Sequence, residues 1–133
     1  MSRAVRVLHF ALLAGVVFAA AVFVFLVRVD HFAVSLPQFI APLFAGGSIA
    51  LLAFATFLRR RIPARASNEP PDEYWTPPER RGAAIVLWAA TEGAALLGIL
   101  GYLLSANLLP GAAALLAIGT LAMFRPSHLE GPV

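Results

Sequence analysis

The residue with the clearest capacity for chemistry is Glu92, an acidic side chain in the middle of the long apolar run 82–104. A carboxyl at the centre of a membrane costs about 2.5–3.5 kcal/mol on insertion scales, so it normally faces protein or water. An apolar environment favours its protonated form, and a carboxyl that exchanges a proton near neutral pH suits proton-linked work. The structural alternative is a protonated acid that donates one hydrogen bond between helices.

Three further polar side chains are candidate partners of Glu92, judged by their depth in neighbouring apolar runs. We expect Ser48 at the same depth in the membrane as Glu92, and Thr120 somewhat nearer the cytoplasmic surface. His9 is expected about five residues from the middle of its own run, or roughly 8 Å along a helix axis. One interpretation makes His9 a proton relay toward Glu92, and the other makes it an interfacial histidine bonded to headgroups or backbone.

The sequence predicts no catalytic, metal or cofactor site. Haem ligation by two histidines needs both at one level, whereas His9 and His31 belong near opposite membrane surfaces. The chain has no cysteine, no clustered carboxylates that would hold a metal, no converging nucleophilic triad and no phosphate-binding glycine loop. We therefore expect a protein that is not an enzyme and needs no cofactor.

The amino-acid composition indicates whether water or lipid surrounds these residues. Of 133 residues, 60% are apolar and 13% charged, against roughly 45–50% and about 25% in soluble domains. So short a chain cannot enclose this excess in a core of its own. The balance excludes a soluble domain and a disordered tail. The net charge of +3 does not indicate nucleic-acid binding either, since the arginines are not arrayed on a folded basic face.

Four apolar runs approach or reach the roughly 20 residues that cross a bilayer core. None shows a polar face at helical spacing, so none is typical of a soluble bundle. The expected fold class is all-α: a four-transmembrane-helix bundle in one membrane domain over 1–133. Its helices are expected at 7–27, 37–58, 82–104 and 108–124.

The connections between these runs carry helix-start signals. Ser35 followed by Gln38 is similar to a capping box, and Asn107 is a plausible N-cap. The three-residue link 105–107 makes the helices on either side of it antiparallel neighbours.

A weak internal repeat is also present. Residues 10–18 align without gaps on 88–96, with one identical alanine and one identical glycine. Either the chain holds two helical hairpins of parallel topology, unlike the inverted repeats of many transporters, or the match reflects shared membrane-helix composition.

Arginine placement predicts orientation. Every arginine except Arg28 lies at the ends of the runs that share a side with the loop 59–81. The positive-inside rule then makes both termini and this loop cytoplasmic, in the inner (plasma) membrane of a cell. The alternative for the first run is a signal peptide, with Arg3 and Arg6 as its basic start and 19–21 as its cleavage site.

The loop 59–81 is rich in proline and arginine, and we expect it to be extended and largely unfolded. Its arginines would rest on anionic headgroups. Its middle is interpreted either as a partner-binding peptide or as a solvated connector whose Tyr74 and Trp75 touch the membrane interface.

Small residues at four-residue spacing predict close helix packing and a homo- or hetero-oligomer within the lipid bilayer. These stripes are Ala11, Gly15 and Ala19; Ala90, Ala94 and Gly98; and Ala41 with Ala45, or Gly46 with Ala50.

Residues 89–100 resemble the proton-carrying helix of the ATP synthase c subunit, the proteolipid of rotary ATPases. In both, a membrane carboxylate is followed by small and apolar residues and by a glycine six positions on, here Glu92 and Gly98. The resemblance implies that Glu92 carries a proton. The small multidrug resistance exporters, with four helices and one membrane glutamate, are a second analogy.

The expected function is ion- or proton-linked transport through Glu92, within an oligomer. The alternative is a non-catalytic structural or assembly subunit that holds a partner through its helices and the loop 59–81.

Overall fold

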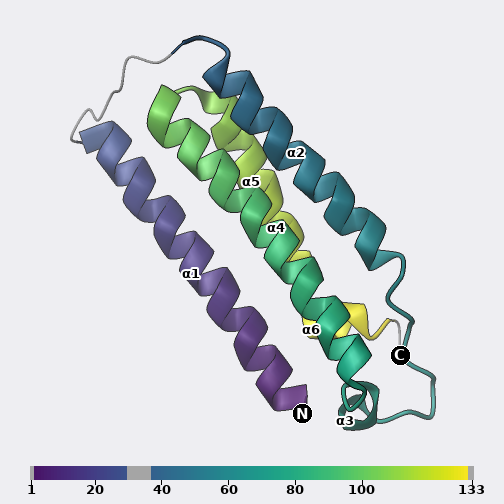
Figure 1. The fold of residues 1–133 in the computed structure, drawn as a ribbon. Coiled ribbons are helices and arrows are strands. Elements are labelled where there is room, and N and C mark those ends of the chain that lie inside the picture. Colours follow the sequence, from purple (N-terminus) through teal and green to yellow (C-terminus); the bar gives the residue numbers. More distant parts are fainter. Residues whose placement is uncertain (1, 30–36, 132–133) are drawn as a thin grey trace.

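The computed structural model describes residues 2–29 and 37–131, which form helices joined by short links and no strand. Four of the helices are long or of medium length and two are single turns (Figure 1). In chain order they are α1 (Ser2–Val29), α2 (Ile40–Arg59), α3 (Pro71–Tyr74), α4 (Pro78–Ser105), α5 (Leu108–Met123) and α6 (Pro126–Leu129).

Two of the helices, α1 and α4, are longer than the apolar runs from which they were predicted. α1 begins at Ser2 and α4 at Pro78, because arginine and glutamate continue a helix well. Proline is favoured in the first turn, where its missing N–H costs nothing. α2 begins at Ile40 rather than 37, and Phe39 caps it without a side-chain hydrogen bond. Ser35, half of the predicted capping box, lies outside the described residues.

The start of α5 agrees with the sequence. The Asn107 side-chain oxygen accepts a hydrogen bond from the Leu109 N–H at 2.8 Å, which confirms the predicted N-cap. Ala106 ends α4 in the left-handed conformation, with φ of 52°. This single residue turns the chain back, so α4 and α5 pack as antiparallel neighbours.

The four main helices are arranged around α4. Figure 1 shows α1 and α2 on opposite flanks of α4, with α5 beside it, and both flanking helices also contact α5. The prediction of two helical hairpins therefore holds only for α4 with α5. In the first pair, α1 packs on α4 and α5 rather than on α2, so it is not a packed hairpin.

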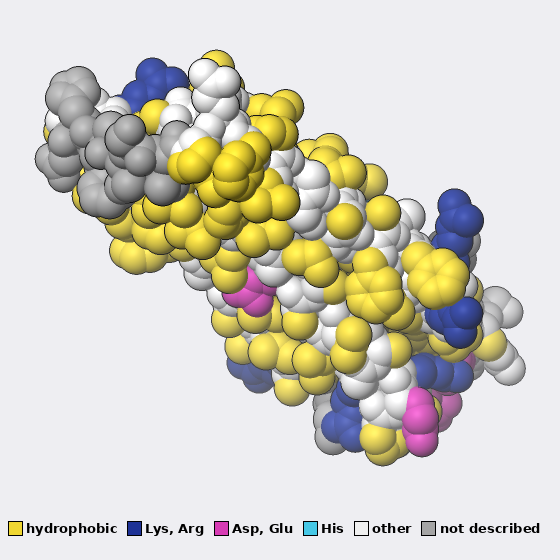
Figure 2. Space-filling view, turned by 45° about the horizontal axis from the view of Figure 1, so that its top comes forward, with side chains coloured by type: hydrophobic (Ala, Val, Ile, Leu, Met, Phe, Trp, Pro, Cys, Tyr) yellow, Lys and Arg dark blue, Asp and Glu magenta, His cyan; other side chains and the backbone are white. Residues whose placement is uncertain are grey.

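Three helices, α1, α2 and α4, are long and apolar enough to cross a membrane. The fourth, α5, is apolar but has 16 residues, which at 1.5 Å each span about 24 Å of a core of about 30 Å. Apolar side chains cover most of the body in Figure 2, and most charged side chains gather toward one end. Exposed residues such as Phe10 and Leu115, 70% and 72% accessible, fit a surface surrounded by lipid. These features identify a membrane protein.

Small residues bring the central helices close together. A side-chain carbon added at Gly98 would lie 2.8 Å from both the Ala114 nitrogen and the Pro110 oxygen of α5. The stripe of Ala90, Ala94 and Gly98 therefore packs inward, as predicted. By contrast, nothing lies within 4 Å of such a carbon at Gly15, so the stripe on α1 is largely unpacked within this chain.

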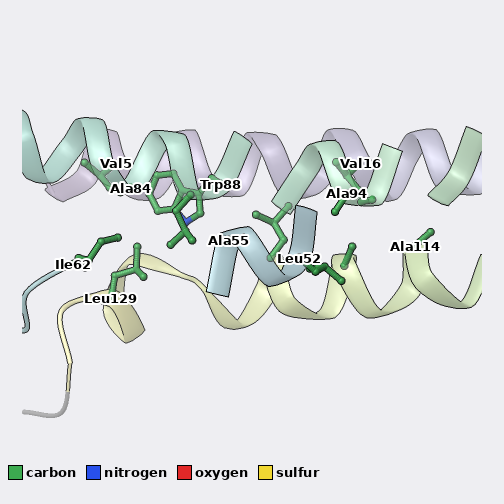
Figure 3. Close-up of a cluster of buried hydrophobic side chains, with 14 of the residues drawn as sticks. Val5, Val16, Leu52, Ala55, Ile62, Ala84, Trp88, Ala94, Ala114 and Leu129 are labelled. Carbon is green, nitrogen blue, oxygen red and sulfur yellow. The ribbon is translucent and has the colours of Figure 1, made fainter. Parts of the chain in front are cut away.

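The buried apolar side chains form one cluster that runs from the helices into the loop between α2 and α4. Figure 3 shows Ile62 of that loop and Leu129 of α6 beside the helical residues Val5 and Ala84. The loop therefore shares the core of the helices.

This loop corrects one prediction. We call residues 60–77 together with 125–131 the end cap. Tyr74 and Trp75 are fully buried in it, so they are neither membrane-interface anchors nor part of an extended peptide. The physical reason is that Pro71 begins a turn of helix, and the carboxyl-terminal segment supplies a cover and hydrogen-bond acceptors for both rings.

Candidate functional site

Glu92 lies at the middle of α4, on the side of the helix that no other helix covers. Exposed apolar residues share this side at helical spacing. We call this surface the open face of α4; it consists of Ile85, Ala89, Glu92, Leu96 and Leu100. The Glu92 side chain is half-buried among these neighbours. One small acidic patch interrupts the apolar mid-section of the surface in Figure 2.

The structure does not bring Glu92 together with the partners predicted from depth. The Ser48 hydroxyl donates to the Ala94 carbonyl at 2.7 Å, and the Thr120 hydroxyl donates to the Leu116 carbonyl at 2.8 Å. Both hydroxyls thus bond backbone oxygens.

Within the described residues, the Glu92 carboxyl has no hydrogen bond and no ion pair. A glutamic acid that joins two helices of this chain would need such a bond. The described residues contain no such bond, and the structural interpretation of Glu92 stays a prediction.

His9 is buried where α1, α4 and α5 meet. Its Nε2–H donates to the Leu121 carbonyl at 2.7 Å, and its ring centroid lies 5.1 Å from that of Trp88. The Trp88 indole N–H in turn donates to the Phe124 carbonyl at 2.7 Å. This arrangement agrees with the interpretation of His9 as a backbone-bonded residue. The proton relay toward Glu92 stays a prediction.

The second polar cluster is the end cap. The Trp75 indole N–H donates to Glu130 Oε1 at 2.8 Å, and the Tyr74 hydroxyl donates to the Pro63 carbonyl at 2.6 Å. The Arg65 backbone N–H donates to the Glu130 carbonyl at 2.7 Å. Each of these bonds satisfies a polar group that the cap removes from water, so the cluster serves folding of the cap.

Charged pairs close the rim of the end cap. Arg80 donates to Glu69 Oε1 at 2.9 Å, and its guanidinium carbon lies 4.7 Å from the centre of the Tyr74 ring. The Arg80 hydrogen bond holds the pKa of the Glu69 carboxyl below its ordinary value. Contacts with Ser2, whose N–H donates to Asp72 Oδ1 at 3.0 Å, likewise lower the pKa of Asp72. Burial raises the pKa of the Tyr74 hydroxyl.

The end cap and the open face are therefore different kinds of site. In the cap, acidic and aromatic side chains already have partners from this chain. At the open face, the Glu92 carboxyl has no partner among residues 2–29 and 37–131.

The chain matches no family model, no curated protein and no solved structure. The resemblance of residues 89–100 to the c subunit of ATP synthase therefore stays a prediction that rests on those residues alone.

The described residues also lack the ligand groups that hold metal ions. Across residues 2–29 and 37–131, no three His, Asp or Glu side chains lie together as metal ligands would. The open face of α4 is the candidate site that remains.

Sequence reasoning missed Arg28 and Tyr102, whose side chains make no hydrogen bond with the residues that the structure describes. Both line an apolar cavity at the end of the bundle opposite the end cap. Arg28 is recognisable as the one arginine apart from the others, and its spacing from Val24 and Ala20 puts all three on one helical face. The role of Tyr102 could not be predicted, because nothing in the sequence indicates that it lies beside α1.

Proposed function

We propose that this chain is a non-catalytic subunit of a membrane assembly, in which the open face of α4 docks on a second copy of the chain. The arginine-rich end cap would lie in the cytoplasm of a cell whose inner membrane holds the bundle, as the arginine distribution favours. The holding surface is then a helix face rather than the loop 59–81, because the aromatic residues of that loop are buried.

The observation that carries this proposal is the Glu92 carboxyl, which lies among exposed apolar side chains and has no hydrogen bond or ion pair with the described part of the chain. In lipid such a group is costly, and a hydrogen-bonding partner removes part of that cost.

A second copy supplies such a partner by symmetry. A two-fold axis along the membrane normal puts the same residue of both copies at the same depth. Two protonated carboxyls, or one protonated and one ionised, can each satisfy the other, since a carboxylic acid both donates and accepts. Ala89, one helical turn from Glu92, is small enough for two α4 helices to approach each other there.

Crosslinking in membranes tests the proposal. Because the chain contains no cysteine, an introduced cysteine is the only thiol that can react. Ala89→Cys puts one thiol on the open face. Ile49→Cys puts it on the exposed side of α2, where Ile49 is 46% accessible. A bifunctional thiol reagent should join copies of Ala89→Cys into dimers and leave Ile49→Cys largely monomeric.

Two further variants at Glu92 identify the cause. In the Ala89→Cys background, Glu92→Leu should lower the dimer yield roughly threefold or more, as loss of an interhelical hydrogen bond predicts. Glu92→Gln should keep the dimer, since an amide also donates and accepts. Equal yields from Ala89→Cys and Ile49→Cys, or no effect of Glu92→Leu, would contradict the proposal.

Proton- or ion-linked transport is the second candidate, favoured by the same carboxyl because no fixed partner holds its proton. The pathway would have to lie between copies. Glu92→Gln separates the two functions, since it keeps the hydrogen bond and removes the exchangeable proton. A flux in proteoliposomes that Glu92→Gln abolishes while the dimer persists would support transport, and no flux in either protein would exclude it.

A further inference from the structure

An apolar cavity lies between α1, α4 and α5 at the end of the bundle opposite the end cap. Its volume is about 300 Å³, at the lower limit of the roughly 300–1,000 Å³ typical of ligand pockets. The walls are largely aliphatic, and two polar side chains join them. The lining includes Val24, Ile99, Leu115, Ile118, Arg28 and Tyr102.

The cavity exists because α1 is packed over only part of its length. The buried residues of α1 are Val5, His9 and Val16, all in the first sixteen residues of the chain. Beyond them, α1 presents Ala20, Val24 and Arg28 to the cavity from one helical face. On the opposite wall, α5 contributes the small residues Gly111 and Ala114, which leave the space unfilled.

The polar atoms of the cavity are available to a ligand. Within the described residues, the Arg28 guanidinium and the Tyr102 hydroxyl make no hydrogen bond and no ion pair. Among the described residues that line the cavity, Arg28 is the one charged side chain, so it attracts an anion.

These features match one class of molecule. The aliphatic part of the wall suits a hydrocarbon chain, because that part offers water no polar partner. A guanidinium with a nearby hydroxyl at the end of such a space binds a phosphate, which it can contact through two parallel hydrogen bonds. We propose that the cavity binds one anionic phospholipid, with an acyl chain between α1 and α5 and the phosphate on Arg28 and Tyr102.

Native mass spectrometry of the full chain in detergent tests this inference, with dioleoylphosphatidylglycerol and dioleoylphosphatidylcholine as probes. The unaltered chain should retain one phosphatidylglycerol about tenfold more tightly than phosphatidylcholine. Arg28→Gln should remove this preference, since one charge-assisted contact corresponds to about a tenfold change in affinity. Tyr102→Phe should weaken phosphatidylglycerol binding less.

Matched variants separate the cavity from the general surface. Arg60→Gln removes an exposed arginine at the other end and should leave the preference intact. Val24→Trp fills the cavity and should reduce retention of both lipids, whereas Val22→Trp, on the opposite side of α1, should not. Oleate should bind more weakly than phosphatidylglycerol.

Three results would overturn the inference: equal retention of the two phospholipids by the unaltered chain, an unchanged preference in Arg28→Gln, or tighter binding of oleate. Unchanged retention in Val24→Trp would also exclude this cavity as the site. None of these outcomes bears on the open face of α4, so the proposed function is tested separately.

Discussion

At the scale of single residues, three polar side chains inside the bundle bond to backbone carbonyls of a segment other than their own helix. Ser48 bonds Ala94, His9 bonds Leu121 and Trp88 bonds Phe124. In a bundle with no hydrophobic driving force between helices, such bonds help to fix which helices adjoin. Glu92 differs from them because its carboxyl extends from the assembled bundle.

The sequence predicts Glu92 itself but not its surroundings. A carboxyl in an apolar run is conspicuous because of its cost, whereas its partners were inferred from depth alone. Depth is one coordinate, and the direction in which a side chain extends from its helix is another. Ser48 shares the depth of Glu92 but extends toward the backbone of Ala94, and only the packing of α2 on α4 decides this.

Acid is expected to loosen the end cap. Because the pKa values of Glu69 and Asp72 are lowered in the folded state, both carboxylates stabilise the cap above their ordinary values of 4.5 and 3.8. That contribution is lost as pH falls through the lowered values. Emission of Trp75, recorded in a Trp88→Phe background, should therefore show the cap opening as the solution is acidified.

Variants at two glutamates check the assignment. Glu69→Gln should flatten the acid dependence and weaken the cap at neutral pH, because Arg80 loses its ionic partner. Glu79→Gln, at an exposed site without that contact, should behave as the unaltered chain. Identical profiles for the two variants would show that the Arg80 pair does not hold the cap.

At the scale of elements, the apolar runs predict the four main helices but not all of their ends. A run of apolar residues marks the part of a helix that lipid surrounds, while the hydrogen-bonded backbone continues through polar residues on either side. The prolines of the loop were interpreted as extended backbone. Pro71 and Pro78 instead occupy first turns of α3 and α4, a placement that proline also favours.

Packing of α4 on α5 should depend on one glycine. Gly98→Ala would put a carbon 2.8 Å from backbone atoms of Ala114 and Pro110, which cannot rotate away. We expect a loss of about 1–3 kcal/mol in the free energy of unfolding. Thermal unfolding in one detergent measures this loss.

The matched control is Gly119→Ala in α5, where nothing lies within 4 Å of the added carbon. This variant should be unchanged or more stable by up to about 1 kcal/mol, since alanine favours a helix over glycine. Equal effects of the two substitutions would show that the close contact at Gly98 is not limiting.

At the scale of the whole molecule, the end cap joins segments that are far apart in the sequence. The start of α1 contacts Asp72, and the segment after α5 covers Tyr74 and Trp75. A sequence pattern cannot reveal this closure, because each segment alone has the composition of a solvated loop. Only their mutual burial makes the aromatic residues part of a core.

Removal of residues 126–133 should open the end cap while leaving the helices inserted. The indole and phenol would lose acceptors and cover, which corresponds to about 1–3 kcal/mol. Trypsin should then cleave near Arg65 roughly tenfold faster, and Trp75 emission should shift to the red. A chain lacking only 132–133 is the control, and equal cleavage of both truncated chains would contradict the prediction.

The bond between Trp75 and Glu130 also sets an order of events during synthesis. The two residues are 55 positions apart, so ribosomes adding roughly 5–20 residues per second produce the acceptor about 3–11 s after the indole. During that interval the loop has been translated but lacks its cover, and α4 and α5 are still being inserted. A nascent chain that stalls before α6 would therefore display two bare aromatic rings, a feature that chaperones and proteases can detect.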